Sequence, residues 1–247
     1  MSASEPAKPE LRIPEPESTS RLHPIWVALL VTVVVTALSY KVPEDYSATA
    51  VGAAFIFAVW WLVLRRDTAT IRHHGLALGG VLEPAPLDPR RAVRDAGQAL
   101  AWSVGLVAII VPPFVVGFRM YRHVSGSFHF VAPASIADEV FGQALVIALP
   151  EEAFYRGYLM TALEDLWGRP WTILGAKLGW GWIASSALFA VGHALTITNV
   201  ERLAVFFPAL LFGWLRARTR GVGASASFHV LCNVLASTLE RGYGIST

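Results

Sequence analysis

The chain has 247 residues, of which 54% are hydrophobic and only 15% charged, and its mean hydropathy is +0.50. Because an average soluble domain carries about 25% charged residues, this composition excludes disorder and argues against an ordinary soluble globule. The net charge is +2, so the chain lacks the basic field of a nucleic-acid-binding protein. Cys232 is the single cysteine, which excludes an internal disulfide.

The first 24 residues form a polar stretch rich in Pro, Glu and Ser. Such a composition cannot bury a core, so it predicts a flexible tail. The stretch is too polar for the start of a signal peptide, so we expect that it is not cleaved off. We also expect this tail to lie in the cytoplasm.

Seven apolar runs follow the tail, and all but the fourth lack Asp, Glu, Lys and Arg. They cover residues 25–40, 47–64, 96–118, 140–163, 180–197, 203–215 and 222–239. About 20 apolar residues cross a bilayer as a helix, and the runs lack the alternation of barrel strands. The sequence therefore predicts an all-α membrane protein, a polytopic bundle of about seven transmembrane helices. Pro112 and Pro113 predict a kink in the third helix, and Pro208 predicts a tilted, broken or re-entrant sixth segment.

Basic residues predict the orientation of the bundle. With the amino terminus in the cytoplasm, 14 of the 20 Lys and Arg fall in inner segments and 5 in outer segments. The inner segments include a basic cytoplasmic loop at residues 65–95, which we expect to be solvated and to touch anionic lipid, together with its His73 and His74. We expect a protein of the bacterial plasma membrane.

The fourth run places Glu151, Glu152 and Arg156 near the middle of an apolar helix. Each charge at that depth costs at least about 2.5–3.5 kcal/mol, so such residues are functional candidates by default. Glu152 and Arg156 are four residues apart and can form an ion pair, whereas Glu151 is rotated by about 100° and stays available. A purely structural Glu–Arg pair between helices is the alternative, and it leaves Glu151 unexplained.

Two later runs carry further polar residues at similar depth. His193 lies in the fifth run, and His229 lies on one face of the last run with Asn233, four residues on. Each histidine alone is more often a hydrogen-bonding residue between membrane helices. Together with a carboxylate, they supply a general base, a proton carrier and oxyanion donors.

These motifs resemble a known family. Glu-Glu-x-x-x-Arg (Glu151, Glu152, Arg156), Phe-x-x-x-His (Phe189, His193) and His-x-x-x-Asn (His229, Asn233) occur in this order on separate predicted helices. The pattern is similar to the CPBP family of intramembrane endopeptidases, the CAAX-protease and bacteriocin-processing type that includes Rce1-like prenyl proteases. The resemblance covers about residues 137–239, and it implies a catalytic transmembrane domain at 136–240 after amino-terminal helices at 25–135.

The resemblance also implies roles for the matched residues. Glu151 and His193 would activate water, Glu152 and Arg156 would hold the first carboxylate, and His229 with Asn233 would stabilise the oxyanion. No cofactor is firmly implied. Zn²⁺ held by Glu151, His193 and His229 remains open as a metalloprotease alternative, although a metal-free site is favoured because no His-Glu-x-x-His motif is present.

The expected function is hydrolysis of a peptide bond near the membrane surface, in a membrane-associated protein or peptide within the lipid bilayer. Two alternatives use the same residues. A proton-coupled transporter would also bury Glu, Arg and His, although no inverted repeat is evident. A non-catalytic immunity or chaperone protein would keep the fold without the reaction.

Overall fold

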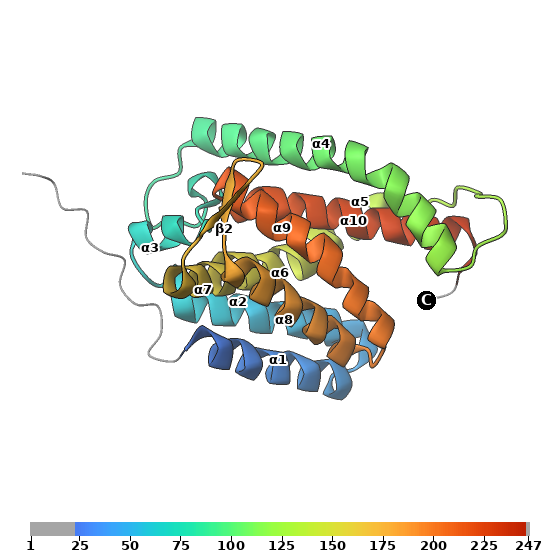
Figure 1. The fold of residues 1–247 in the computed structure, drawn as a ribbon, viewed down its shortest axis with the longest axis horizontal. Helices are drawn as coiled ribbons and strands as arrows, with labels where there is room; N and C mark the ends of the chain where they lie inside the picture. The colour runs from blue at the N-terminus through green and yellow to red at the C-terminus, as the bar shows by residue number, and fades with distance from the viewer. Residues whose placement is uncertain (1–22, 246–247) are drawn as a thin grey trace, which may run out of the picture.

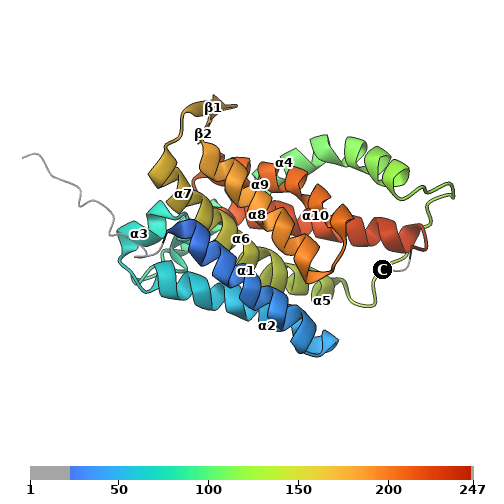
Figure 2. The same cartoon turned by 60° about the horizontal axis from the view of Figure 1, so that its bottom comes forward.

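The computed structural model describes residues 23–245, and the predicted tail lies outside this part of the chain except for its last two residues. The long helices pack side by side as a bundle (Figures 1 and 2). The elements are α1 (Pro24–Lys41), α2 (Glu44–Val59) with the π-helical η1 (Trp60–Leu64), α3 (Thr68–His73), the 3₁₀ turn η2 (Leu78–Gly80), α4 (Pro89–Tyr121), α5 (Ile136–Phe141), η3 (Gly142–Ala148), α6 (Leu149–Glu152), η4 (Ala153–Leu159), α7 (Met160–Trp167), β1 (Trp171–Ile173), β2 (Ala176–Leu178), α8 (Trp180–Thr196), the 3₁₀ helix η5 (Val200–Val205), α9 (Phe206–Thr219) and α10 (Val222–Gly242).

Each of the seven apolar runs is helical. Within the described residues, four helices are long and apolar enough to cross a membrane: Pro24–Lys41, Glu44–Leu64, Pro89–Tyr121 and Val222–Gly242. The predicted count of about seven spanning helices is therefore not confirmed, whereas the all-α class is. A two-stranded antiparallel hairpin, β1–β2, was not predicted; it joins α7 to α8 and pairs Trp171 with Leu178.

Local sequence explains where several helices begin. Asp88 accepts a hydrogen bond from the Arg90 amide at 3.0 Å, and Pro89 occupies the first helical position of α4. Ser135 accepts from the Asp138 amide at the start of α5. Short polar side chains at the N-cap, the residue just before the first helical turn, accept hydrogen bonds from backbone amides that have no acceptor inside the helix. Pro112 and Pro113 lie inside α4, which continues as one helix but bends in its second half (Figure 1).

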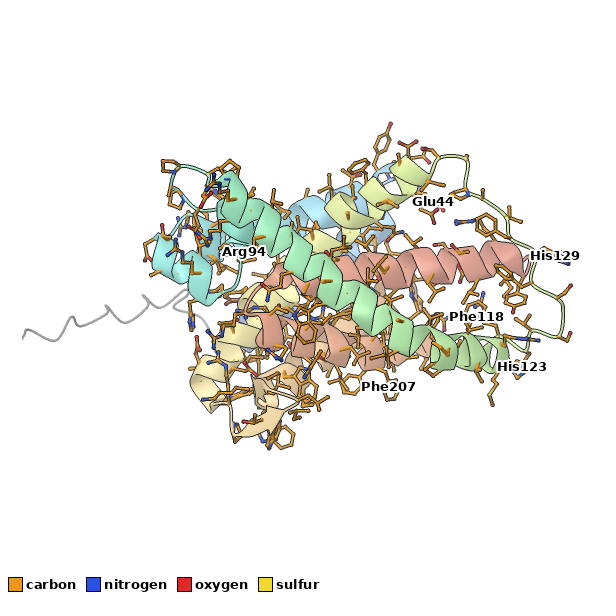
Figure 3. All side chains as sticks on the ribbon, turned by 90° about the horizontal axis from the view of Figure 1, so that it is seen from above. Glu44, Arg94, Phe118, His123, His129 and Phe207 are labelled. Carbon is orange, nitrogen blue, oxygen red and sulfur yellow. The ribbon has the colours of Figure 1, made fainter. Side chains whose placement is uncertain are left out.

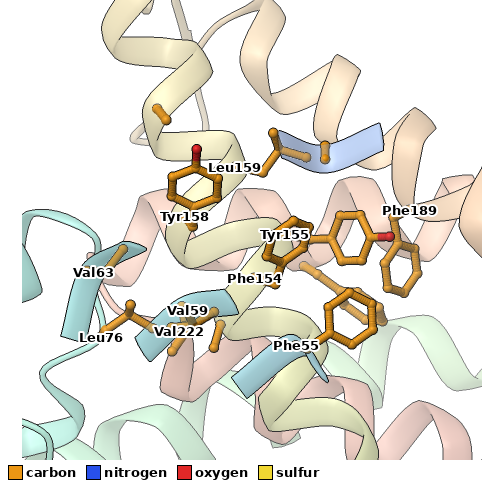
Figure 4. Close-up of a cluster of buried hydrophobic side chains, with 14 of the residues drawn as sticks. Phe55, Val59, Val63, Leu76, Phe154, Tyr155, Tyr158, Leu159, Phe189 and Val222 are labelled. Atoms are coloured by element: carbon orange, nitrogen blue, oxygen red, sulfur yellow. The ribbon is translucent and has the colours of Figure 1, made fainter. Parts of the chain in front are cut away.

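The fourth apolar run passes through the centre of the bundle. The segments α5, η3, α6, η4 and α7 follow one another without a break, and every residue from 152 to 164 is buried. Phe154 and Tyr155 pack against Phe55 of α2, with ring centroids 5.4 and 5.6 Å away, and Tyr155 meets the ring of Phe189 of α8 at 5.1 Å (Figure 4). The fold thus surrounds the Glu151–Arg156 stretch with the other helices.

The loops of the chain gather at two opposite ends of the bundle (Figure 3). The start of α4, where Arg94 is labelled, lies at the same end as α3, and His123 and His129 lie at the opposite end (Figure 3). The hairpin and the end of α7 also lie at the α3 end (Figure 1). This agrees with the prediction that successive loops lie at opposite ends of the bundle. Which end faces the cytoplasm stays a prediction.

The loop at residues 65–95 is partly folded onto the core. Ile71 and Leu76 are fully buried, so the segment between them packs against the helical bundle. His74 is 2% exposed, and its ring stacks on Tyr158 at 6.3 Å. Burial lowers the pKa of His74 to about 4, so its imidazole is neutral at pH 7. The expectation of a solvated His74 was wrong, and the partly exposed His73 contacts Asp165 at 2.7 Å.

Candidate active site

The helix that carries the two glutamates is locally widened on both sides of them. The π-helical segment η3 ends at Ala148, α6 contains both carboxylates, and the π-helical η4 begins at Ala153. Isolated π turns within helices are rare and are frequently found at functional sites. Simple α-helical spacing does not foresee them.

Glu152 and Arg156 form the expected ion pair. The Arg156 Nη1 lies 2.8 Å from the Glu152 Oε1, and both side chains are fully buried. Arg156 also donates from Nη2 to the Ala209 carbonyl of α9 at 3.2 Å. Its guanidinium carbon lies 4.2 Å from the ring centre of Phe189 and 5.1 Å from that of Phe212. The pair therefore ties η4 to α8 and α9.

Glu152 also contacts His229 of α10. The Glu152 Oε1 lies 3.2 Å from His229 Nδ1. As the carboxylate partner of Arg156, Glu152 accepts this hydrogen bond and the Nδ1–H of His229 donates it. This contact fixes the ring of His229 with its Nε2 facing Glu151, 3.9 Å from Glu151 Oε2.

His193 approaches Glu151 from α8. Its Nδ1 lies 3.1 Å from the Phe189 carbonyl, which can only accept, so Nδ1 is the donor. The other nitrogen, Nε2, lies 3.9 Å from Glu151 Oε2. The side chains of His193 and Glu151 are 21% and 12% exposed, so this is the more accessible side of the cluster.

Glu151 Oε2 therefore lies equally far from two imidazole nitrogens that belong to different helices. A separation of 3.9 Å is too long for a direct hydrogen bond but suits a bridge through one water molecule. A carboxylate and two imidazoles in this arrangement can take up and release protons of a bridging water.

Asn233 lies apart from this trio. Its Nδ2 donates to the Gln143 Oε1 of η3 at 2.7 Å, which links α10 to the glutamate-bearing helix. Sequence reasoning missed Gln143, although a lone amide in an apolar run eight residues before Glu151 is a usable signal.

Aromatic rings enclose the histidines. Phe189, expected to pack the site, lies 4.2 Å from the ring of His193. Phe212 of α9 stacks on His229 at 4.6 Å with an interplanar angle of 19°. Phe212 was missed, because a phenylalanine within an apolar run carries no signal of its own.

The geometry does not favour the zinc alternative. Tetrahedral ligands about 2.0–2.1 Å from Zn²⁺ lie roughly 3.3 Å from one another, whereas both Glu151–histidine distances are 3.9 Å. Between residues 23 and 245, no group of three or more His, Cys, Asp or Glu is arranged to hold a metal ion. The metalloprotease interpretation is therefore not supported by the arrangement of these donors.

Comparison with known families gives an independent result. Residues 133–235 match the family described as type II CAAX prenyl endopeptidase, Rce1-like. No curated protein and no solved structure matches the chain. The matched segment contains both glutamates, Arg156, both histidines and Asn233. The match supports the resemblance found in the sequence: residues 133–235 of this integral membrane protein are similar to the Rce1-like family of type II CAAX prenyl endopeptidases.

Proposed function

We propose that the protein is an intramembrane endopeptidase in which Glu151 and His193 activate the water that attacks a peptide bond. The observation that carries this proposal is the position of Glu151 Oε2, 3.9 Å from Nε2 of both His193 and His229. One water molecule between these atoms donates one proton toward Glu151 and the other toward His193.

In the proposed reaction, the water oxygen attacks the carbonyl carbon as Glu151 takes a proton from it. His193, whose Nδ1 is held by the Phe189 carbonyl, accepts the second proton of the water at Nε2 and delivers it to the leaving amine. Cleavage of the carbon–nitrogen bond then gives a carboxylate and an amine. The protein begins the next cycle once Glu151 has lost its proton.

His229 and Asn233 are the proposed stabilisers of the tetrahedral oxyanion. His229 donates from Nδ1 to Glu152, and in its doubly protonated form it also donates from Nε2 toward the oxyanion. Asn233 has its amide held by Gln143, which orients the remaining amide N–H. Removal of one such donor in other enzymes slows the reaction about 10²–10³-fold.

Glu152 and Arg156 are positioning residues in this proposal. They hold the ring of His229 and tie three helices together through contacts of 2.8–3.2 Å. The family resemblance implies that the pair holds Glu151 directly, whereas the contacts favour His229 as the group that it orients.

The proposed substrate is a membrane-associated protein or peptide, cut near the membrane surface. Prenylated carboxy termini, peptide leaders and carboxy-terminal sorting anchors are the substrate classes that the family suggests. The proposed setting is a bacterial plasma membrane with the amino terminus in the cytoplasm, supported by the concentration of basic residues in alternate loops.

The experiment compares the wild type with Glu151→Gln and Asp138→Asn in detergent. Asp138 is the matched control because it is an exposed carboxylate on the same continuous helix, outside the cluster. All three proteins are incubated with membrane-anchored substrates of the three classes, with and without a chelator. Cleavage by the wild type and Asp138→Asn, its loss in Glu151→Gln and its persistence with chelator support the proposal.

Two other outcomes would replace it. Proton-coupled flux in liposomes without cleavage would favour a transporter. Neither cleavage nor flux, with a folded wild type, would favour a non-catalytic immunity or chaperone protein.

A further inference from the structure

A second polar region lies at the basic end of the bundle. A cavity of about 490 Å³ is lined by residues of the segment 72–79, the start of α4 and the turn between α9 and α10. None of the proposed active-site residues lines it. The cavity is thus separate from the proposed protease site, and the proposed reaction does not use it.

Three arginines line this cavity, namely Arg72, Arg91 and Arg220. Glu83 accepts two hydrogen bonds from each of Arg72 and Arg91, at 2.7–3.0 Å, which fixes both guanidiniums in place. A guanidinium has five N–H donors, so three remain on each arginine.

Arg220, unlike Arg72 and Arg91, is not held by a carboxylate. It is exposed, and its side chain makes no ion pair or hydrogen bond with any of the described residues. Asp95 also lines the cavity and lies 3.3 Å from Arg94 and 3.9 Å from Arg91. The three lining arginines therefore exceed the two carboxylates, Glu83 and Asp95, by one positive charge.

The start of α10 adds backbone donors to the same wall. Gly223 and Ala224 line the cavity within the first turn of this 21-residue helix, which begins after Gly221 without a side-chain cap. Their amides have no acceptor four residues earlier within the helix. The positive end of the helix dipole and these amides favour an anion.

Part of the remaining lining is apolar, and part is polar through Gln98, Thr219 and Ser227. Leu78, Ala96 and Ala99 contribute apolar surface beside the arginines. Only 6% of the apolar window of α4 is buried, and this helix is long and apolar enough to cross a membrane. Basic pockets between membrane helices near the cytoplasmic surface are suited to lipid headgroups.

We propose that this cavity is a binding site for a phosphate group, supplied by the headgroup of an anionic phospholipid or by a soluble phosphate. Arg220 and the Arg72–Arg91 pair contact the phosphate oxygens, since planar guanidiniums match this geometry. The amides at the start of α10 complete the site, and the apolar wall accommodates the glycerol and first acyl carbons of a lipid.

The test measures binding to the delipidated full chain in detergent by native mass spectrometry, using phosphatidylglycerol, phosphatidylcholine and inorganic phosphate. Arg220→Gln removes the unrestrained cation. Gly223→Leu fills the cavity without changing charge, because a Cβ there meets Ala99 and Leu78 only at ordinary contact distances of 3.6 Å. Arg90→Gln is the control, since Arg90 is an exposed cation at the same end that does not line the cavity.

We expect phosphatidylglycerol to bind at least about tenfold more weakly to Arg220→Gln and to Gly223→Leu, the ratio that corresponds to one charge-assisted hydrogen bond. Arg90→Gln should match the wild type, and phosphatidylcholine should not bind saturably. If inorganic phosphate shows the same variant pattern and displaces the lipid, a soluble phosphate is the source; if it does not, the lipid is. Equal binding of phosphatidylglycerol by all four proteins, or equal binding of both lipids, overturns the proposal.

Discussion

The buried pair of Glu152 and Arg156 offers a test that separates stability from catalysis. Arg156→Met removes a 2.8 Å ion pair, a 3.2 Å hydrogen bond to Ala209 and a cation–π contact with Phe189 at 4.2 Å. Removing one member of a buried pair costs about 3–5 kcal/mol, because the other charge is left unpaired. The cation–π contact adds roughly 1–2 kcal/mol. We therefore expect destabilisation of about 4–7 kcal/mol and no cleavage.

The double variant Glu152→Gln/Arg156→Met removes both charges. It should recover most of the lost stability, because no unpaired charge remains in the core. It should not recover cleavage, because His229 then lacks the carboxylate that orients it. Thermal unfolding in detergent and a cleavage assay measure the two properties. A double variant as unstable as Arg156→Met, or a single variant as stable as the wild type, would refute this reasoning.

Two further predictions concern the basic loop and the amide pair. Arg72 and Arg91 lower the pKa of Glu83 from its usual 4.5 to about 2, so the stability that Glu83 contributes is present above pH 4.5 and is lost as the pH falls toward 2. The difference in unfolding free energy between the wild type and Glu83→Gln should shrink by roughly 1–2 kcal/mol over this range, since solvent screens the half-exposed Arg72; a constant difference would contradict the assignment. Gln143→Leu removes the acceptor of the Asn233 amide and should lower kcat about tenfold with KM unchanged, whereas Gln143→Glu keeps an acceptor and should recover part of kcat. Steady-state kinetics check this, and an unchanged kcat in Gln143→Leu would remove Asn233 from the proposed oxyanion site.

Much of the fold follows from apolar patterning. Each of the seven apolar runs is helical, because a chain in a bilayer must satisfy its backbone hydrogen bonds internally. The short β1–β2 hairpin was not foreseen, since residues 168–179 carry mainly turn signals. The burial of His74 was also missed, because it depends on Ile71 and Leu76 packing against the core rather than on the local basic composition.

The candidate site was foreseen in its members but not in its connections. The spacing of Glu152 and Arg156 predicts their ion pair, since residues four apart share a helical face. The contact between Glu152 and His229 joins residues 77 positions apart, so only the packing of α6 against α10 creates it. The same holds for Asn233 and Gln143, which meet across 90 positions.

The rate of cleavage in Glu151→Gln tests the central claim most directly. A membrane-anchored substrate that the wild type cuts is mixed with an excess of each protein in the presence of a chelator, and the single-turnover rates are compared after both proteins are shown to be folded. Since a positioned general base contributes about 10²–10⁴-fold, we predict a rate at least about 10²-fold lower for Glu151→Gln and an undiminished rate for the chelated wild type. A Glu151→Gln rate within a few fold of the wild type would contradict the proposed role of Glu151.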